Sequence, residues 1–316
     1  MKILLSYVEW KREKFEYQSM DEFRKTLKGL GLDGIELVSC WEDNFIARDL
    51  IHGVHLPFFT SWMDYYLKKE DRVIEEFGSM DIARELFLNK PEEIYKYYLQ
   101  ALAYANSLGS YSVFHMANCN SLEYLGQNHF YSDKDVIDAG ADLVNKLIKE
   151  ANIKSPLLFE NLYVPGLKFT NLSLTKRLLE KVSYDNIGFV LDTGHLMCTN
   201  ENIETEGEAW EYVDQIIEYN REILPFIKVV HLHGSQSGKL IKAYKENPPQ
   251  MTGDFYENLK DYYKYVNKID THSLVRSKKA RDLIEKINPD YLVLEFSYRD
   301  RKDMEEKTKR QLEIFK

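Results

Sequence analysis

Acidic and histidine residues stand at the ends of several short apolar runs in this sequence. In residues 188–195, a run of apolar and small residues leads into Asp192, and His195 follows three positions later. A buried strand that presents two metal-type ligands at its carboxyl end would have this pattern. Other apolar runs end in His115, Glu160, His231 and Glu295. The recurrence indicates that several strands bring His, Asp and Glu side chains into one pocket.

Spacing within these runs gives their side chains a common direction. Leu158 and Glu160 are two residues apart, as are Val190 and Asp192, so each pair lies on one face of its strand. We therefore expect an apolar layer below a polar rim. Imidazole and carboxylate together suit zinc, manganese or iron, and carboxylate-rich sets also suit magnesium.

Eight apolar runs of strand length alternate with helical patterns along the chain. We expect strands at residues 3–8, 33–39, 53–56, 111–115, 157–160, 188–192, 227–233 and 291–296. Near-continuous apolar strands separated by helices are typical of a parallel sheet that is covered on both faces. Eight such units favour a closed (β/α)8 barrel of the α/β class, and no glycine fingerprint for a dinucleotide follows the first strand. We interpret residues 1–316 as one such domain, with its site at the carboxyl ends of the strands.

Two connections are longer than a barrel requires, and both are rich in aromatic residues. One follows the third strand and carries Trp62 and Tyr66, and the other extends from residue 235 to about 275 after the seventh strand. Aromatic residues at helical spacing can simply pack on the barrel. Alternatively, these segments are lids, and Trp62 and Tyr66 bind a bulky, flat substrate.

Composition limits the partners that the protein can have. The 316 residues carry a formal net charge of −9, and we find no extended basic face. Such a chain is expected to repel nucleic acid and anionic membranes. No apolar run approaches the length of a membrane span, and the three cysteines are far apart. We therefore expect a soluble, cytoplasmic protein with a small-molecule substrate. The sequence does not indicate its oligomeric state.

On its ordered motifs, the sequence resembles the xylose isomerase-like barrels, and within them the endonuclease IV branch. The motifs are HLP at His55, FHM at His115, FEN at Glu160, DTGH at Asp192 and His195, VHLH at His231, DTHSL at Asp270 and His272, and LEF at Glu295. Isomerases and epimerases of this superfamily keep a tetrad that matches Glu160, Asp192, His231 and Glu295, around one metal. The endonuclease branch adds matches to His55, His115, His195, Asp270 and His272, for three metals.

The resemblance implies up to three divalent metals per chain, with zinc favoured and manganese, iron or magnesium as alternatives. The first metal would take His55, His115 and Glu160. The second would take Glu160, Asp192, His231 and Glu295. The third would take His195, Asp270 and His272. Taken singly, His55 or His115 could instead be a core imidazole, and Asp270 could cap a helix.

Three histidines do not match a ligand position of the family. His233 is two residues from His231 and therefore faces the same way, so it could replace His231 or contact substrate. His52 and His129 match no position, and we interpret them as structural or surface residues.

The resemblance implies a metal-dependent hydrolase of phosphodiesters. The acidic chain argues against duplex DNA as the substrate, and relatives in the superfamily cut small phosphodiesters such as the nucleotide loop of corrinoids. The alternative is a sugar or sugar-phosphate isomerase or epimerase, in which Glu160 and Glu295 exchange a proton at carbon. Glu160 and Glu295 are thus the predicted catalytic residues. A binding barrel without turnover is a third interpretation.

Overall fold

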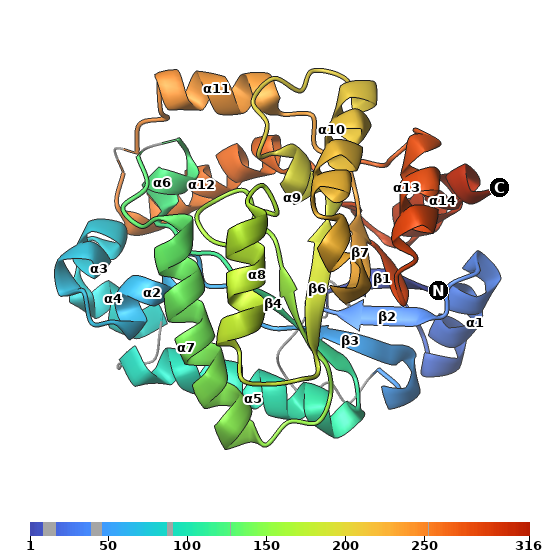
Figure 1. Cartoon of the computed structure of the whole chain (residues 1–316), viewed down its shortest axis with the longest axis horizontal. Coiled ribbons are helices and arrows are strands. Elements are labelled where there is room, and N and C mark those ends of the chain that lie inside the picture. The colour runs from blue at the N-terminus through green and yellow to red at the C-terminus, as the bar shows by residue number, and fades with distance from the viewer. Residues whose placement is uncertain (9–16, 39–45, 87–90, 127, 252) are drawn as a thin grey trace.

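Eight parallel strands close into a barrel in the order in which they follow along the chain (Figure 1). They are β1 (Lys2–Tyr7), β2 (Gly34–Leu37), β3 (Ile51–His55), β4 (Tyr111–His115), β5 (Leu157–Glu160), β6 (Ile187–Asp192), β7 (Ile227–Leu232) and β8 (Tyr291–Leu294). Pairing of β1 with β8, with Leu4 opposite Val293, closes the barrel. The predicted (β/α)8 fold is confirmed.

The computed structural model describes residues 1–8, 17–38, 46–86, 91–126, 128–251 and 253–316. The predicted strands agree with the observed ones to within a few residues. Residue 39, the predicted end of the second strand, lies outside the described ranges. None of the described helices is both long and apolar enough to cross a membrane.

Apolar side chains from alternate strand positions fill the barrel interior. Leu4, Val113, Leu158, Val190, Val229 and Val293 form this inner cluster, and each is essentially inaccessible to solvent. Tyr111 adds a ring to the cluster, and a side chain at Gly53 would collide with that ring at 2.2 Å. The packed interior leaves the rim at the carboxyl ends of the strands as the place for polar side chains.

Helices outside the barrel cover the other face of the strands. They are α1 (Met20–Leu30), α5 (Pro91–Leu108), α7 (Asp133–Ala151), α8 (Leu172–Lys181), α10 (Glu206–Tyr219), α13 (Lys279–Ile287) and α14 (Arg301–Leu312). Short 3-10 turns lie at η2 (Arg48–Leu50), η3 (Arg221–Phe226) and η4 (Glu313–Phe315). The sequence signals for α1 are explicit: the Ser19 side chain accepts a hydrogen bond from the Glu22 amide, and Gly31 ends the helix at φ 81°.

The two predicted long connections contain helices of their own. The first holds α2 (Trp62–Tyr66), α3 (Glu70–Phe77) and α4 (Met80–Leu86), and the second holds α11 (Gly238–Glu246) and α12 (Phe255–Ile269). Short helices α6 (Ser121–Tyr124) and α9 (Thr193–Met197) follow β4 and β6. In Figure 1, α6, α11 and α12 lie near the end of the barrel at which β6 leads into α9. The carboxyl ends of the strands therefore carry the extra structure.

Candidate metal centre

The first group of donor side chains comes from three neighbouring strands. His55, His115 and Glu160 are the last residues of β3, β4 and β5. His55 Nε2 lies 3.1 Å from Glu160 Oε2, and His115 Nε2 lies 3.1 Å from Glu160 Oε1. The strand register explains the convergence, because His115 is paired directly with Glu160.

The second group shares Glu160 with the first. It adds Asp192 at the end of β6, His231 on β7 and Glu295 directly after β8. His231 Nδ1 lies 2.8 Å from Glu295 Oε2, 3.5 Å from Glu160 Oε1 and 3.9 Å from Asp192 Oδ2. Glu160 thus stands between two sets of potential ligands.

The third group brings together α9 and the segment after α12. His195 Nε2 lies 3.1 Å from Asp270 Oδ2, and His272 Nε2 lies 2.9 Å from the same oxygen. His233 joins them, since one donor atom from each of the four residues lies within 4.8 Å of the others. His272 has φ 43°, which is uncommon outside glycine, and its Nδ1 is 2.7 Å from the Glu295 carbonyl oxygen. Asp270 directs its carboxylate to these histidines rather than capping a helix start.

The motif DTGH has a local structural reason. Asp192 is the N-cap of α9, and its Oδ1 accepts a hydrogen bond of 2.6 Å from the His195 amide. The cap turns the chain so that His195 enters the pocket one turn beyond the strand. The other Asp192 oxygen remains for the neighbouring donor groups.

Hydrogen bonds outside the cluster orient most of its histidines. His55 Nδ1 and His195 Nδ1 lie 3.0 Å and 3.1 Å from the carbonyl oxygens of Leu56 and Asn161. His231 Nε2 lies 3.0 Å from Glu36 Oε1. In each case the ring N–H that donates outward leaves the other nitrogen facing the cluster, where a bound metal would take the place of its proton.

Several donor atoms of the cluster are buried and make no hydrogen bond. They are both ring nitrogens of His115, Glu160 Oε1, Nδ1 of His231 and of His233, and Glu295 Oε2. These atoms face one another within the donor groups. Buried polar atoms without a partner cost free energy, and a bound cation would supply the missing partner. Histidine nitrogens and carboxylate oxygens in this arrangement fit divalent cations such as zinc.

Opposite charges dominate the electrostatics of the cluster. Burial lowers the pKa of His55, but the hydrogen bond to Glu160 and its charge raise that pKa to about 9. Burial likewise opposes the charged form of His272, yet Asp270 raises the pKa of His272 to about 10. Burial alone would raise the pKa of Glu160, but the neighbouring charges of His115 and His231 hold it well below its ordinary value. Glu160 is therefore ionised, as metal binding requires.

Sequence reasoning missed Glu36, which lies below the cluster inside the barrel. Glu36 is a β2 residue with no exposed surface, and Glu36 Oε2 accepts a hydrogen bond of 2.8 Å from the Tyr111 hydroxyl. It also contacts His231 Nε2, as described above. The available signal was a single carboxylate inside the otherwise apolar run Gly34–Leu37.

The predicted substrate-binding residues do not lie together. Trp62 is fully buried, and its Nε1 donates a hydrogen bond of 2.9 Å to the Ala117 carbonyl. Trp62 is thus a core residue, which corrects the expectation that it contacts substrate. Tyr66 accepts a hydrogen bond of 2.7 Å from Lys146 Nζ and lines a surface pocket away from the donor groups. His233 does lie in the cluster, but it is fully buried.

A cavity of about 640 Å³ lies between the two long connections. Its wall includes Phe58 and Phe77 from the first connection, Tyr124 of α6, and Phe255 and Tyr263 of α12. The Phe58 ring is 4.4 Å from the His115 ring, measured between centroids, so the cavity wall reaches the first donor group. The aromatic residues of the two connections thus face a common space beside the donor cluster.

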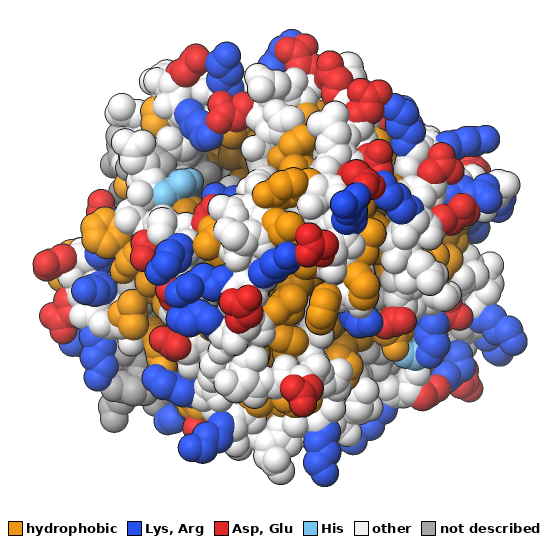
Figure 2. Space-filling model, in the orientation of Figure 1, with side chains coloured by type: hydrophobic (Ala, Val, Ile, Leu, Met, Phe, Trp, Pro, Cys, Tyr) orange, Lys and Arg blue, Asp and Glu red, His pale blue; other side chains and the backbone are white. Residues whose placement is uncertain are grey.

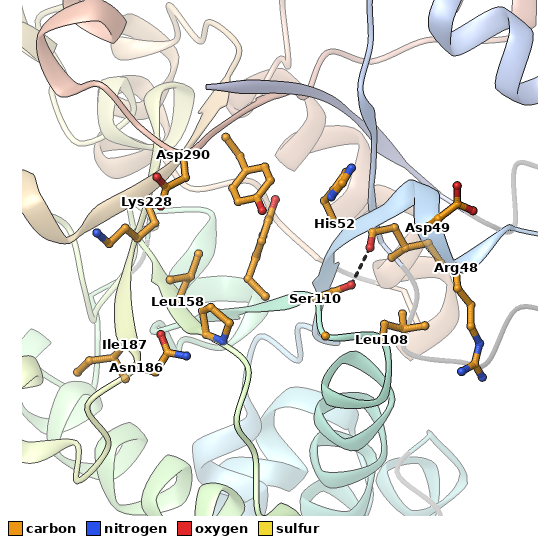
Figure 3. Close-up of a pocket in the computed structure, with 15 residues that line it drawn as sticks. Arg48, Asp49, His52, Leu108, Ser110, Leu158, Asn186, Ile187, Lys228 and Asp290 are labelled. Atoms are coloured by element: carbon orange, nitrogen blue, oxygen red, sulfur yellow. Dashed lines mark hydrogen bonds between the residues drawn. The ribbon is translucent and has the colours of Figure 1, made fainter.

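A second cavity, of about 310 Å³, lies at the opposite, amino end of the barrel (Figure 3). Lys228 and Asp290 lie on one side of it, and Arg48, Asp49 and His52 lie on the other (Figure 3). His52 is half-buried, and its ring is 5.9 Å from that of Tyr291. The amino end of such barrels serves stability rather than chemistry, and the position agrees with a structural role for His52.

The visible surface carries mixed charge. In Figure 2, Lys and Arg side chains are interleaved with Asp and Glu over the face shown, and among the described residues of that face no continuous basic area is seen. A groove that follows a duplex backbone would need such an area.

The structure therefore defines a parallel (β/α)8 barrel with three converging groups of His, Asp and Glu at the carboxyl ends of its strands. The profile of the xylose isomerase-like TIM barrel family matches residues 23–316, and the chain belongs to this family. Members of this family are enzymes that bind divalent metals. Comparison with the sequences of curated proteins gives no match.

Similar solved structures include both kinds of enzyme. The 3-keto-D-glucoside 4-epimerase from E. coli is 13% identical, with a TM-score of 0.55 over 100% of this chain and 99% of that chain. A D-tagatose 3-epimerase-like protein is 16% identical, with a TM-score of 0.52 over 99% and 98%. Endonuclease IV from Thermus thermophilus is 12% identical, with a TM-score of 0.44 over 85% and 100%. At these identities the likeness shows the fold alone.

Proposed function

We propose that the protein is a metal-dependent hydrolase of phosphodiesters. The observation that carries this proposal is the convergence of three donor groups at one end of the barrel, two of which share Glu160. A single-metal enzyme has no need for the groups around His55 and Asp270. Clustered divalent cations, when bound, supply Lewis acidity for the phosphoryl oxygens and lower the pKa of water toward neutrality.

The protein's own residues would fix the geometry of this chemistry. Glu160 stands between the first and second groups and would set their separation, and Glu295 completes the second group beside His231. The outward hydrogen bonds of the histidines hold the ring nitrogens in place before substrate arrives, which lowers the cost of reorganisation.

We further propose that the substrate is an organic phosphodiester with a bulky, flat group rather than duplex DNA. The aromatic cavity beside His115 offers a place for such a group, because aromatic rings give large apolar contact areas. The net charge of −9 and the mixed surface argue against binding along a duplex backbone.

Turnover of bis(p-nitrophenyl) phosphate by the zinc-loaded or manganese-loaded protein tests the reaction class. We expect hydrolysis by the wild type and by Glu180→Gln, an exposed substitution on α8, and none by Glu160→Gln. Full turnover by Glu160→Gln would refute the assigned role of Glu160.

A sugar or sugar-phosphate isomerase or epimerase is the second candidate. Glu160, Asp192, His231 and Glu295 form a complete ligand set without the other groups, and this observation favours it. Glu160 and Glu295 would then exchange a proton at carbon. Conversion of a ketose in a substrate panel, with no phosphodiester cleavage, would select this alternative.

A further inference from the structure

His233 occupies a position that neither of its predicted roles explains. It follows β7 directly, has no exposed surface, and stacks on the His272 ring with centroids 4.0 Å apart and planes at 9°. Its complete burial gives no support to a direct substrate contact. Replacement of His231 is not needed either, because His231 itself lies in the second donor group.

One ring nitrogen of His233 makes a hydrogen bond, and the other has no hydrogen-bond partner. Nε2 lies 2.9 Å from Asp192 Oδ2, whereas Nδ1 is buried and has no hydrogen-bond partner. Carboxylate oxygens accept hydrogen bonds, so the contact with Asp192 engages Nε2 and leaves Nδ1 as the nitrogen available to a ligand. Nδ1 lies 3.9 Å from Asp270 Oδ1, on the side of the third group.

Packing fixes the ring in this orientation. A side chain at Gly194 would place its Cβ 2.0 Å from Cε1 of His233, so the ring requires glycine at this position of the DTGH motif. The Thr193 hydroxyl donates a hydrogen bond of 2.6 Å to the His233 carbonyl and accepts one of 3.2 Å from the His233 amide. Both the ring and the backbone of His233 are therefore positioned in advance.

We propose that His233 is the fourth protein ligand of the third donor group, with His195, Asp270 and His272. A carboxylate–histidine–metal arrangement, with Asp192 as the carboxylate, is common at metal sites. Four protein ligands close a tetrahedral site, whereas hydrolytic sites keep an open position. A cation at the third group would thus be held as a fixed charge, whereas the first group, with only His55, His115 and Glu160, would leave a position open. This inference rests on the proposed function, because it assumes that all three groups bind cations.

Cobalt substitution provides the test. The full-length protein is loaded with Co²⁺, and cobalt content, visible absorption and resistance to a chelator are compared for the wild type, His233→Ala, His233→Gln and the control His129→Ala. We expect three cobalt ions per chain and intense four-coordinate bands in the wild type and in His129→Ala. In both His233 variants the third cobalt should be lost at a chelator concentration at least about tenfold lower, with weaker bands.

The outcomes separate this inference from the proposed function. His233→Gln keeps an amide donor for Asp192, so it serves if His233→Ala does not fold. Three cobalt ions with the same bands and the same chelator resistance in a folded His233 variant would overturn the role of His233 while leaving the proposed function intact. A single cobalt ion in the wild type would overturn both.

Discussion

Replacing Glu36 by glutamine probes how the barrel interior prepares the donor cluster. Glu36 lies below the cluster, carries no exposed surface, and sits 3.0 Å from His231 Nε2 and 2.8 Å from the Tyr111 hydroxyl. Its carboxylate keeps the His231 proton on Nε2, so that Nδ1 faces Glu160 and Glu295. Glutamine preserves size but removes the charge that raises the basicity of the imidazole.

The expected effect is large enough to measure. Loss of such an outer carboxylate weakens metal binding by about 10–100-fold, which corresponds to about 1.4–2.7 kcal/mol. The weakening should be confined to one cation of the set, because His231 is the one candidate ligand, among the residues that the structure describes, with which Glu36 makes a hydrogen bond. Chelator competition with zinc-loaded protein measures it.

Tyr111→Phe is the matched control. It removes the hydroxyl that donates to Glu36 but leaves the Glu36 carboxylate beside His231. The metal affinity should therefore fall by less in Tyr111→Phe than in Glu36→Gln. The free energy of unfolding should fall by about 1 kcal/mol for the lost hydrogen bond. If Glu36→Gln holds every cation as tightly as the wild type, the reasoning about His231 is refuted.

Three further predictions concern the surroundings of the site. Trp62→Phe should lower the free energy of unfolding by about 1–3 kcal/mol, because the buried Ala117 carbonyl loses its hydrogen-bond donor, and KM should not change. A raised KM with an unchanged free energy of unfolding would show instead that Trp62 contacts the substrate. Tyr263 is 56% exposed on the cavity wall, and Tyr263→Ala should raise KM without lowering the free energy of unfolding. Tyr219 is 54% exposed on α10, and the control Tyr219→Ala should change neither KM nor the free energy of unfolding. Equal KM values in both variants would show that the cavity does not bind the substrate. Burial raises the pKa of Glu76 to about 7, so the carboxyl binds its proton more tightly in the folded protein than in the unfolded chain. The free energy of unfolding should therefore fall as pH rises from about 4.5 through 7. Denaturant unfolding of Glu76→Gln should show a weaker dependence of this free energy on pH, and an unchanged dependence would contradict the burial argument.

The sequence was sufficient to predict the barrel and the position of the candidate donor residues at its rim, for one physical reason. Parallel strands in a barrel share one direction, so a His, Asp or Glu that ends an apolar run must lie at the same rim as the others. His115, Glu160 and Asp192 end their strands, and Glu295 follows its strand directly. These residues converge because of the strand register. The position of the apolar residues along each strand already limits which registers are possible.

Other features depend on tertiary packing that no local pattern reports. Whether the Glu36 carboxylate faces the barrel interior depends on how β2 pairs with its neighbours, including the shift in register between Ile35 and Glu36 against β3. Trp62 begins the five-residue helix α2, which is too short for an apolar repeat to show that its ring packs inward. The two-residue spacing predicts that His233 faces the same way as His231. In the structure, however, His233 belongs to the group of Asp270, which lies 37 residues further along the chain, and the spacing cannot show this.

Anomalous diffraction at the zinc edge, from crystals of the zinc-loaded protein, tests the central claim most directly. We predict three peaks: one between His55, His115 and Glu160, one between Glu160, Asp192, His231 and Glu295, and one between His195, His233, Asp270 and His272. A single peak at the Glu160–Glu295 tetrad, with none at the other two groups, would contradict the account of a multinuclear hydrolase.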